Sequence, residues 1–114
     1  MEPIFHLTTP AEWADALAAG TYRRSTRGRS LEEVGFIHCS YAHQVEQIAD
    51  LIYGGETTLV LLVIDPAALD VREEPASEGG AAYPHIYGPL PVASVVEAVE
   101  LHADAAGRFR MPSR

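Results

Sequence analysis

The segment LVLLVI at residues 59–64 is a run of six apolar residues, and it limits the fold of this chain more than any other segment. The run is too short to cross a membrane, and Pro66 closes it shortly afterwards. A run of this length fits a strand that is buried on both faces. The sequence therefore predicts a central strand over about 57–65.

Other segments supply the elements around this strand. IFHLT at 4–8 alternates like a strand, and Thr9 begins a capping box for a helix that ends at Gly20. A second helix is expected over about 41–53, where apolar residues recur at helical spacing, with Ser40 as its N-cap. Further strands or extended segments are expected at 21–22, 36–40, 71–73, 83–91, 92–101 and 108–111.

The segments between them, 21–34 and 74–82, are expected to be loops because glycine, proline and charged residues accumulate there. Two helices with about six short strands predict a single α+β domain over 1–114.

Cysteine content and the N-terminal residues bear on the compartment. Cys39 is alone in the sequence, so no disulfide within the chain is possible. The N-terminal MEPIFHLTT lacks the basic and apolar regions of a secretory signal. We therefore expect a cytoplasmic protein that does not enter a membrane.

The charge of the chain bears on its partners. The net charge is −8, which makes nucleic acid an unlikely partner. Four of the eight arginines nevertheless lie within residues 23–29, and such a cluster can hold a phosphate or pyrophosphate through forked hydrogen bonds. A solvated loop whose charge only aids solubility remains the alternative.

Three short segments share a second pattern, in which a histidine lies inside an apolar strand. Side chains alternate between the two faces of a strand. One face of the segments therefore carries His6 with Thr8, His38 with Ser40, and His85 with Tyr87. We expect the apolar face of each segment to pack on the core and the histidine face to point away from it, towards a common site.

Two other interpretations of the histidines stay open. Each can be a half-buried residue with no chemical role. The three can also bind a metal ion, although no His-x-His or H-E-x-x-H spacing is present.

The order of the motifs FHLTT, GFIHCS, LVLLVID and PHIYGPLP resembles the bacterial family known as domain of unknown function 952. That family is similar to the ADP-ribosyltransferase fold, and in motif order to the RNA 2'-phosphotransferases that consume NAD. The resemblance covers nearly the whole chain. It implies small split antiparallel sheets with two helices and a cleft for NAD as a substrate.

The resemblance also implies roles for single residues. It makes His6, His38 and His85 the catalytic candidates, with His6 on a ribose hydroxyl and His85 as an acid or base. The cofactor-binding candidates that it implies are Thr8, Ser40, Tyr83, Tyr87, Arg24, Arg27 and Arg29.

The chain departs from the implied patterns at two points. No acidic residue lies in PHIYGPLP, where protein-modifying ADP-ribosyltransferases place a catalytic glutamate, and Phe5 replaces the arginine before the first motif histidine of the RNA enzymes. We therefore expect an NAD-dependent ADP-ribosyl or phosphate transferase with a small acceptor, or a degenerate relative of one. The alternatives are a non-catalytic module that binds a nucleotide or ADP-ribose, and a metal-dependent enzyme. The sequence leaves the oligomeric state open.

Overall fold

Three antiparallel sheets form the framework of the computed structural model, which describes residues 2–25, 27–75 and 79–112. The sheets have the strand orders β1-β4-β8, β2-β7 and β3-β6-β5. The strands are β1 (Ile4–Thr8), β2 (Thr21–Tyr22), β3 (Ile37–His38), β4 (Thr58–Ile64), β5 (Val71–Pro75), β6 (Ala82–Ile86), β7 (Leu90–Pro91) and β8 (Val95–His102). The helices are α1 (Pro10–Ala19), α2 (Leu31–Val34) and α3 (Val45–Ile52), with short 3₁₀ turns η1 (Ala42–Gln44) and η2 (Val92–Ser94).

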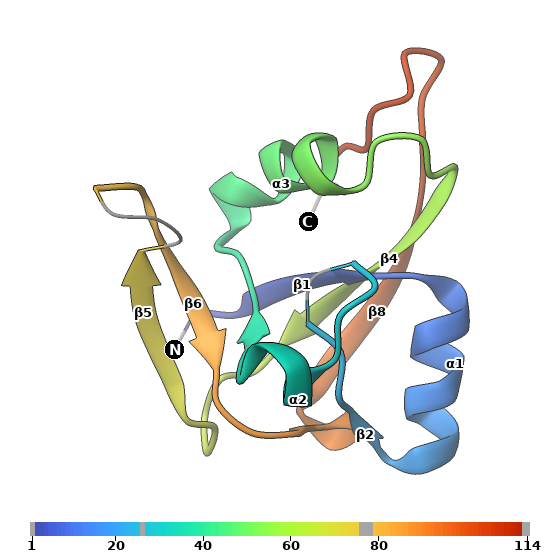
Figure 1. Cartoon of the computed structure of the whole chain (residues 1–114). Coiled ribbons are helices and arrows are strands. Elements are labelled where there is room, and N and C mark those ends of the chain that lie inside the picture. Colours follow the sequence, from blue (N-terminus) through green and yellow to red (C-terminus); the bar gives the residue numbers. More distant parts are fainter. Residues whose placement is uncertain (1, 26, 76–78, 113–114) are drawn as a thin grey trace.

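Strand β4 lies between β1 and β8, which confirms the predicted central strand. Its side chains enter two separate cores, one on each face of the sheet. Leu59, Leu61 and Val63 pack with α3, whereas Leu62 and Ile64 pack with residues of α1, β2, β3 and β6. Figure 1 shows the β5–β6 hairpin at the left of the view and α1 at the right, with the β1-β4-β8 sheet between them in the view.

The two longer helices confirm the expected positions, but the cap of the second differs. Thr9 caps α1 through the backbone N–H of Glu12, and Gly20 ends the helix with a φ of 86°. Ser40 does not cap α3, because its backbone forms an antiparallel bridge with Phe5. The chain instead enters α3 through the 3₁₀ turn η1, whose N-cap is Tyr41.

The predicted loop at 21–34 was wrong in part, because it contains α2. Ser30 and Glu33 form a reciprocal capping box that starts this helix, and Gly35 ends it with a φ of 95°. The predicted edge strand at 108–111 was also wrong: these residues form no strand in the described structure.

The predicted loop at 74–82 is shorter than expected. Glu74 and Pro75 belong to β5, and Ala82 begins β6, so the segment is the end of a hairpin. Residues 76–78 of the predicted loop lie outside the described residues. Cross-strand bonding in the hairpin keeps Glu74 in β5 although VREEP has little apolar character.

Candidate functional site

The site begins with two histidines that face each other across a strand pair. Strand β3 pairs with β6 so that His38 lies directly opposite His85. His38 Nδ1 and His85 Nε2 are 3.3 Å apart, and the ring centroids are 5.3 Å apart. The structure therefore brings together two of the three histidines that the sequence singled out.

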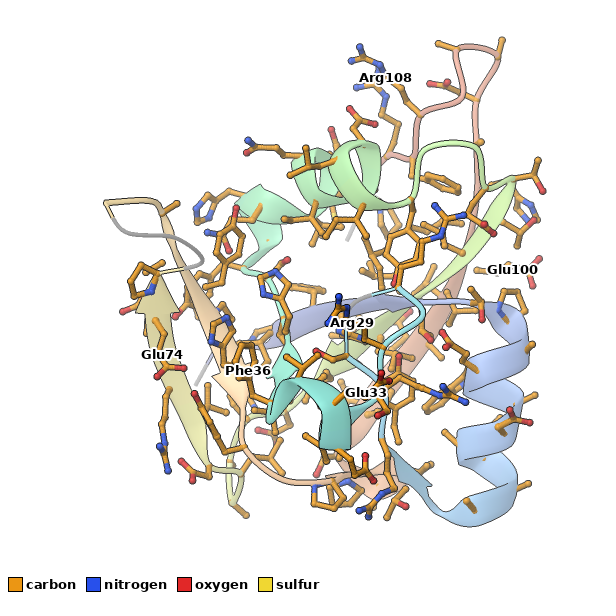
Figure 2. The ribbon with its side chains drawn as sticks, viewed as in Figure 1. Arg29, Glu33, Phe36, Glu74, Glu100 and Arg108 are labelled. Carbon is orange, nitrogen blue, oxygen red and sulfur yellow. The ribbon has the colours of Figure 1, made fainter. Side chains whose placement is uncertain are left out.

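Glu74 on β5 joins the far side of this pair. Its Oε1 accepts a hydrogen bond from His85 Nδ1 at 2.9 Å and another from the Tyr87 hydroxyl at 2.5 Å. These bonds, that from Tyr87 above all, hold the pKa of the Glu74 carboxyl below its usual value. Phe36 stacks on the His85 ring with a centroid distance of 4.0 Å, so the ring is fixed in its plane as well. Figure 2 labels Glu74 on β5 and Phe36 beside the hairpin.

The other end of the pair, at His38, is a ring nitrogen without a hydrogen-bond partner in the described part of the chain. His38 Nε2 is buried and has no hydrogen-bond partner in the described part of the chain. Burial, and secondarily the charge of His85, lowers the pKa of His38 to about 4. The ring is therefore neutral at physiological pH and presents one nitrogen that can exchange a proton with a bound molecule.

His6 has a different environment, which corrects the expectation that its face points away from the core. The residue is 4% exposed, its Nδ1 donates to the His38 carbonyl at 2.6 Å, and its Nε2 lies 2.9 Å from the Tyr22 hydroxyl. Burial lowers the pKa of His6 to about 4. Both ring nitrogens are thus used within the protein, so His6 holds the backbone of β3 in this conformation.

The network behind His6 reaches the surface through two hydroxyls. The Tyr22 hydroxyl oxygen lies 2.8 Å from Thr8 Oγ1, which in turn lies 3.2 Å from a carboxylate oxygen of Glu12. Thr8 has no exposed surface. The predicted cofactor-binding side chain is therefore part of the packing between β1, α1 and β2.

A small cavity lies between His6 and His38. Its volume is about 10 Å³, which is enough for one water-sized group. The polar lining consists of His6, Ser25, His38 and Ser40, and the apolar lining consists of Leu7, Ile48, Ile52 and the ring of Tyr53. Ser40 thus lines the same space as His38, in agreement with their shared face. The space is too small for a dinucleotide in this conformation.

A larger cavity of about 680 Å³ lies apart from the histidine pair. It is lined by Glu2, Phe5, Tyr41 and Glu73, among others, and no arginine lies among its described lining residues. Glu73 is the neighbour of Glu74 on β5 and points to the opposite face of the strand. Two carboxylates in its wall make this cavity unfavourable for a phosphate.

The predicted phosphate-binding arginines do not gather at one point. Arg24 lies 3.7 Å from a Glu12 oxygen, and Arg27 bonds to Glu56 at 2.7 Å and to a carbonyl at the end of α3. The side chain of Arg29, in the loop between β2 and α2, forms no ion pair or hydrogen bond within the described residues, and Figure 2 labels it in the middle of the view, above α2. Of the three, only Arg29 has a guanidinium without a partner in the part of the chain described.

Comparison with known proteins assigns this sequence to a family. The sequence matches the family described as "Protein of unknown function (DUF952)" over residues 7–98. The chain belongs to the DUF952 family. The matched segment includes Glu74, His85 and His38, whereas His6 precedes it.

Solved structures of one protein are similar to this chain in sequence and fold. The crystal structure of protein CC0527 from Caulobacter crescentus is 34% identical, covers 95% of this chain and 93% of its own, and has a TM-score of 0.82. The solution NMR structure of the same protein is 35% identical, covers 95% and 91%, and has a TM-score of 0.78. No curated protein matches the chain.

The histidines of this DUF952 chain do not converge as metal ligands do. His6 turns both nitrogens to protein groups, and the facing nitrogens of His38 and His85 bond to each other. Among the described residues, no group of three or more His, Cys, Asp or Glu side chains is placed to hold a metal ion. The geometry therefore gives no support to the three-histidine metal enzyme.

The sequence interpretation missed Glu74, Phe36 and Tyr22. Glu74 fell at the start of a predicted loop, and Phe36 was counted only as an apolar strand residue. The strand alternation within VREEP, which puts Glu74 and Arg72 on one face, could have indicated the position of Glu74. Tyr83 and Tyr87 do lie near the pair: the Tyr83 ring is 4.9 Å from the His38 ring, and Arg72 covers the Tyr87 ring at 4.2 Å.

No helix in the described part of the DUF952 chain is long and apolar enough to span a membrane.

Proposed function

We propose that this DUF952 protein is an NAD-dependent transferase that moves an ADP-ribosyl group, or a phosphate as the RNA 2'-phosphotransferases do, on a small acceptor. The single observation that carries the proposal is the buried and unpartnered Nε2 of His38, a neutral residue that lines a small cavity. An unpaired polar atom costs free energy in a folded protein, about 1–3 kcal/mol. Its presence beside Ser40 is therefore better explained by a bound reactant than by stability.

The ADP-ribosyl transfer that His38 would assist has a simple proton balance. The bond between ribose C1′ and the nicotinamide nitrogen breaks, and its electron pair leaves with the nicotinamide. The acceptor oxygen forms a new bond to C1′, and its proton goes to His38 Nε2. Positive charge that develops on the sugar is stabilised by a site that fixes the ribose in place. General-base assistance of this kind contributes roughly 10²–10⁴-fold to the rate.

Three further features support a nucleotide as the substrate. The order of the motifs resembles that of the ADP-ribosyltransferase fold, and the split antiparallel sheets fit such a fold. Arg29 has a guanidinium without a partner among the described residues, which suits a pyrophosphate. The cavity of about 10 Å³ is itself too small for a nucleotide, so the proposal requires that the segments around His38 separate when the nucleotide binds.

The experiment has two stages. A thermal-shift titration with NAD, ADP-ribose and nicotinamide identifies binding, and a nicotinamide-release assay then measures turnover. We expect saturable stabilisation by NAD in the wild type and loss of nicotinamide release in His38→Gln. His102→Gln is the matched control, because His102 is exposed and distant in sequence from the pair. No stabilisation at millimolar concentrations of any of the three would contradict the proposal.

A second candidate is a non-catalytic module that binds a nucleotide or ADP-ribose. The absence of an acidic residue from PHIYGPLP, where protein-modifying ADP-ribosyltransferases place a catalytic glutamate, favours it. Stabilisation by NAD or ADP-ribose without any release of nicotinamide would identify this function.

A further inference from the structure

Glu74, His85 and His38 form a linear hydrogen-bonded chain with a defined direction. Glu74 is at the outer end with a side chain that is 37% exposed, whereas the His85 side chain is 4% exposed. His38 Nε2 is at the inner end and has no partner in the described residues. The chain therefore runs from a partly hydrated carboxylate to a single buried nitrogen of His38, a residue that lines the small cavity.

The first link fixes the proton on His85. An ionised carboxylate can only accept hydrogen bonds, so the 2.9 Å contact with Glu74 requires that His85 Nδ1 carries the proton. Tyr87 donates to the same oxygen, which keeps Glu74 ionised and oriented. In a neutral His85 ring, Nε2 then carries a lone pair and can only accept a hydrogen bond.

The second link transfers this restriction to His38. Nδ1 of His38 faces the lone pair of His85 Nε2 at 3.3 Å, so the contact is a hydrogen bond only if His38 Nδ1 carries the proton. A neutral His38 ring with its proton on Nδ1 has a lone pair on Nε2. The opposite tautomer places two lone pairs face to face and leaves a buried N–H with no partner.

We propose that Glu74 is a positioning residue that sets the tautomer of His38 through His85, so that the unpartnered His38 Nε2 is left with a lone pair as a proton acceptor. Phe36, stacked on His85 at 4.0 Å, prevents the intermediate ring from turning out of line. The assignment of a reacting acceptor to His38 rests on the proposed function, whereas the tautomer of His38 is a property of the free protein.

The decisive measurement is the protonation of the histidine nitrogens, read from long-range ¹H–¹⁵N NMR spectra of uniformly ¹⁵N-labelled protein at neutral pH. The His38 signals are assigned by their loss in His38→Gln. We expect an unprotonated Nε2 and a protonated Nδ1 for His38 in the wild type. In Glu74→Ala, the protonated fraction of Nε2 should rise, because the outer acceptor for His85 is gone.

The matched control is Glu73→Ala. Glu73 is the adjacent residue of β5, and it accepts a hydrogen bond from Tyr41 at 3.0 Å and not from His85. This variant should leave the His38 tautomer unchanged. A protonated Nε2 in the wild type overturns the proposal even if Glu74→Ala fails to fold. An unchanged tautomer in a folded Glu74→Ala variant overturns it as well.

Activity gives an independent measurement if the protein releases nicotinamide. Glu74→Ala should then lower kcat by about 10-fold or more with little change in KM, because the base is misdirected and nucleotide binding is kept. If the tautomer of His38 is as expected but no nucleotide binds, the positioning role of Glu74 stands and the proposed function fails. The two outcomes are therefore distinguishable.

Discussion

The Tyr22 hydroxyl is the most informative atom to remove, because it joins two buried polar groups. Tyr22 is 1% exposed, and its hydroxyl lies 2.8 Å from Thr8 Oγ1 and 2.9 Å from His6 Nε2. Tyr22→Phe keeps the ring and its packing and deletes only this atom. Thr8 and His6 then each lack one partner in a region without water-exposed surface.

The expected loss follows from these two groups. A buried polar group that loses its partner costs about 1–3 kcal/mol. Thr8 retains its bond to Glu12, and His6 retains its bond to the His38 carbonyl, so the low end of the range applies to each. We expect the free energy of unfolding to fall by about 2–3 kcal/mol, which corresponds to roughly 8–12 °C in Tm for a domain of this size.

Urea unfolding followed by circular dichroism measures this difference, and Tyr41→Phe is its control. The Tyr41 hydroxyl donates to Glu73 at 3.0 Å on the surface, so the same chemical change there should cost less than about 0.5 kcal/mol. Equal losses in the two variants would refute the reasoning, since they would mean that the hydroxyl of Tyr22 has no more influence on stability than an exposed one.

Three further predictions concern other groups. Burial lowers the pKa of His6 to about 4 from its ordinary 6.5, so its contribution to stability is full above pH 6.5 and is lost as the pH falls towards 4. His6 should account for on the order of 3 kcal/mol of this loss in urea unfolding. His6→Gln should therefore reduce the pH dependence, with the part due to the similarly lowered pKa of His38 remaining, whereas His102→Gln should leave it unchanged. Burial raises the pKa of the Cys39 thiol, so native protein should not react with a thiol reagent at pH 8 but should react fully in denaturant. Arg29→Ala should weaken stabilisation by NAD several-fold, whereas Arg108→Ala, which changes an exposed arginine elsewhere, should leave it unchanged.

The sequence predicted elements well where one local signal dominated. The strand at Ile4–Thr8, the cap at Thr9, the stop at Gly20 and the central strand all follow from patterns within a few residues. The prediction failed where a distant partner decided the outcome. Ser40 has the chemistry of a helix cap, but the bridge to Phe5 uses its backbone in a sheet instead.

In the candidate site, too, local patterns predicted some features, whereas contacts between distant segments decided the others. Strand alternation placed His38 and Ser40 on one face, and both line the small cavity. Alternation could not show that His6 is buried, because the second face of β1 is covered by Tyr22, which comes from a separate sheet. The role of Glu74 likewise depends on the pairing of β5 with β6, which local sequence does not specify.

His38 is held at both ends by networks from different parts of the fold. His6 binds its backbone carbonyl from β1, and His85 binds its ring from β6. Buried polar networks of this kind seldom add stability over apolar packing of the same shape, but they do restrict a group to one orientation. Two such networks meet at one residue, His38, and leave its last ring nitrogen without a partner in the described structure. They therefore favour a requirement for orientation over one for stability. The proposed tautomer, a neutral ring with a lone pair on Nε2, is what proton transfer from a bound acceptor needs.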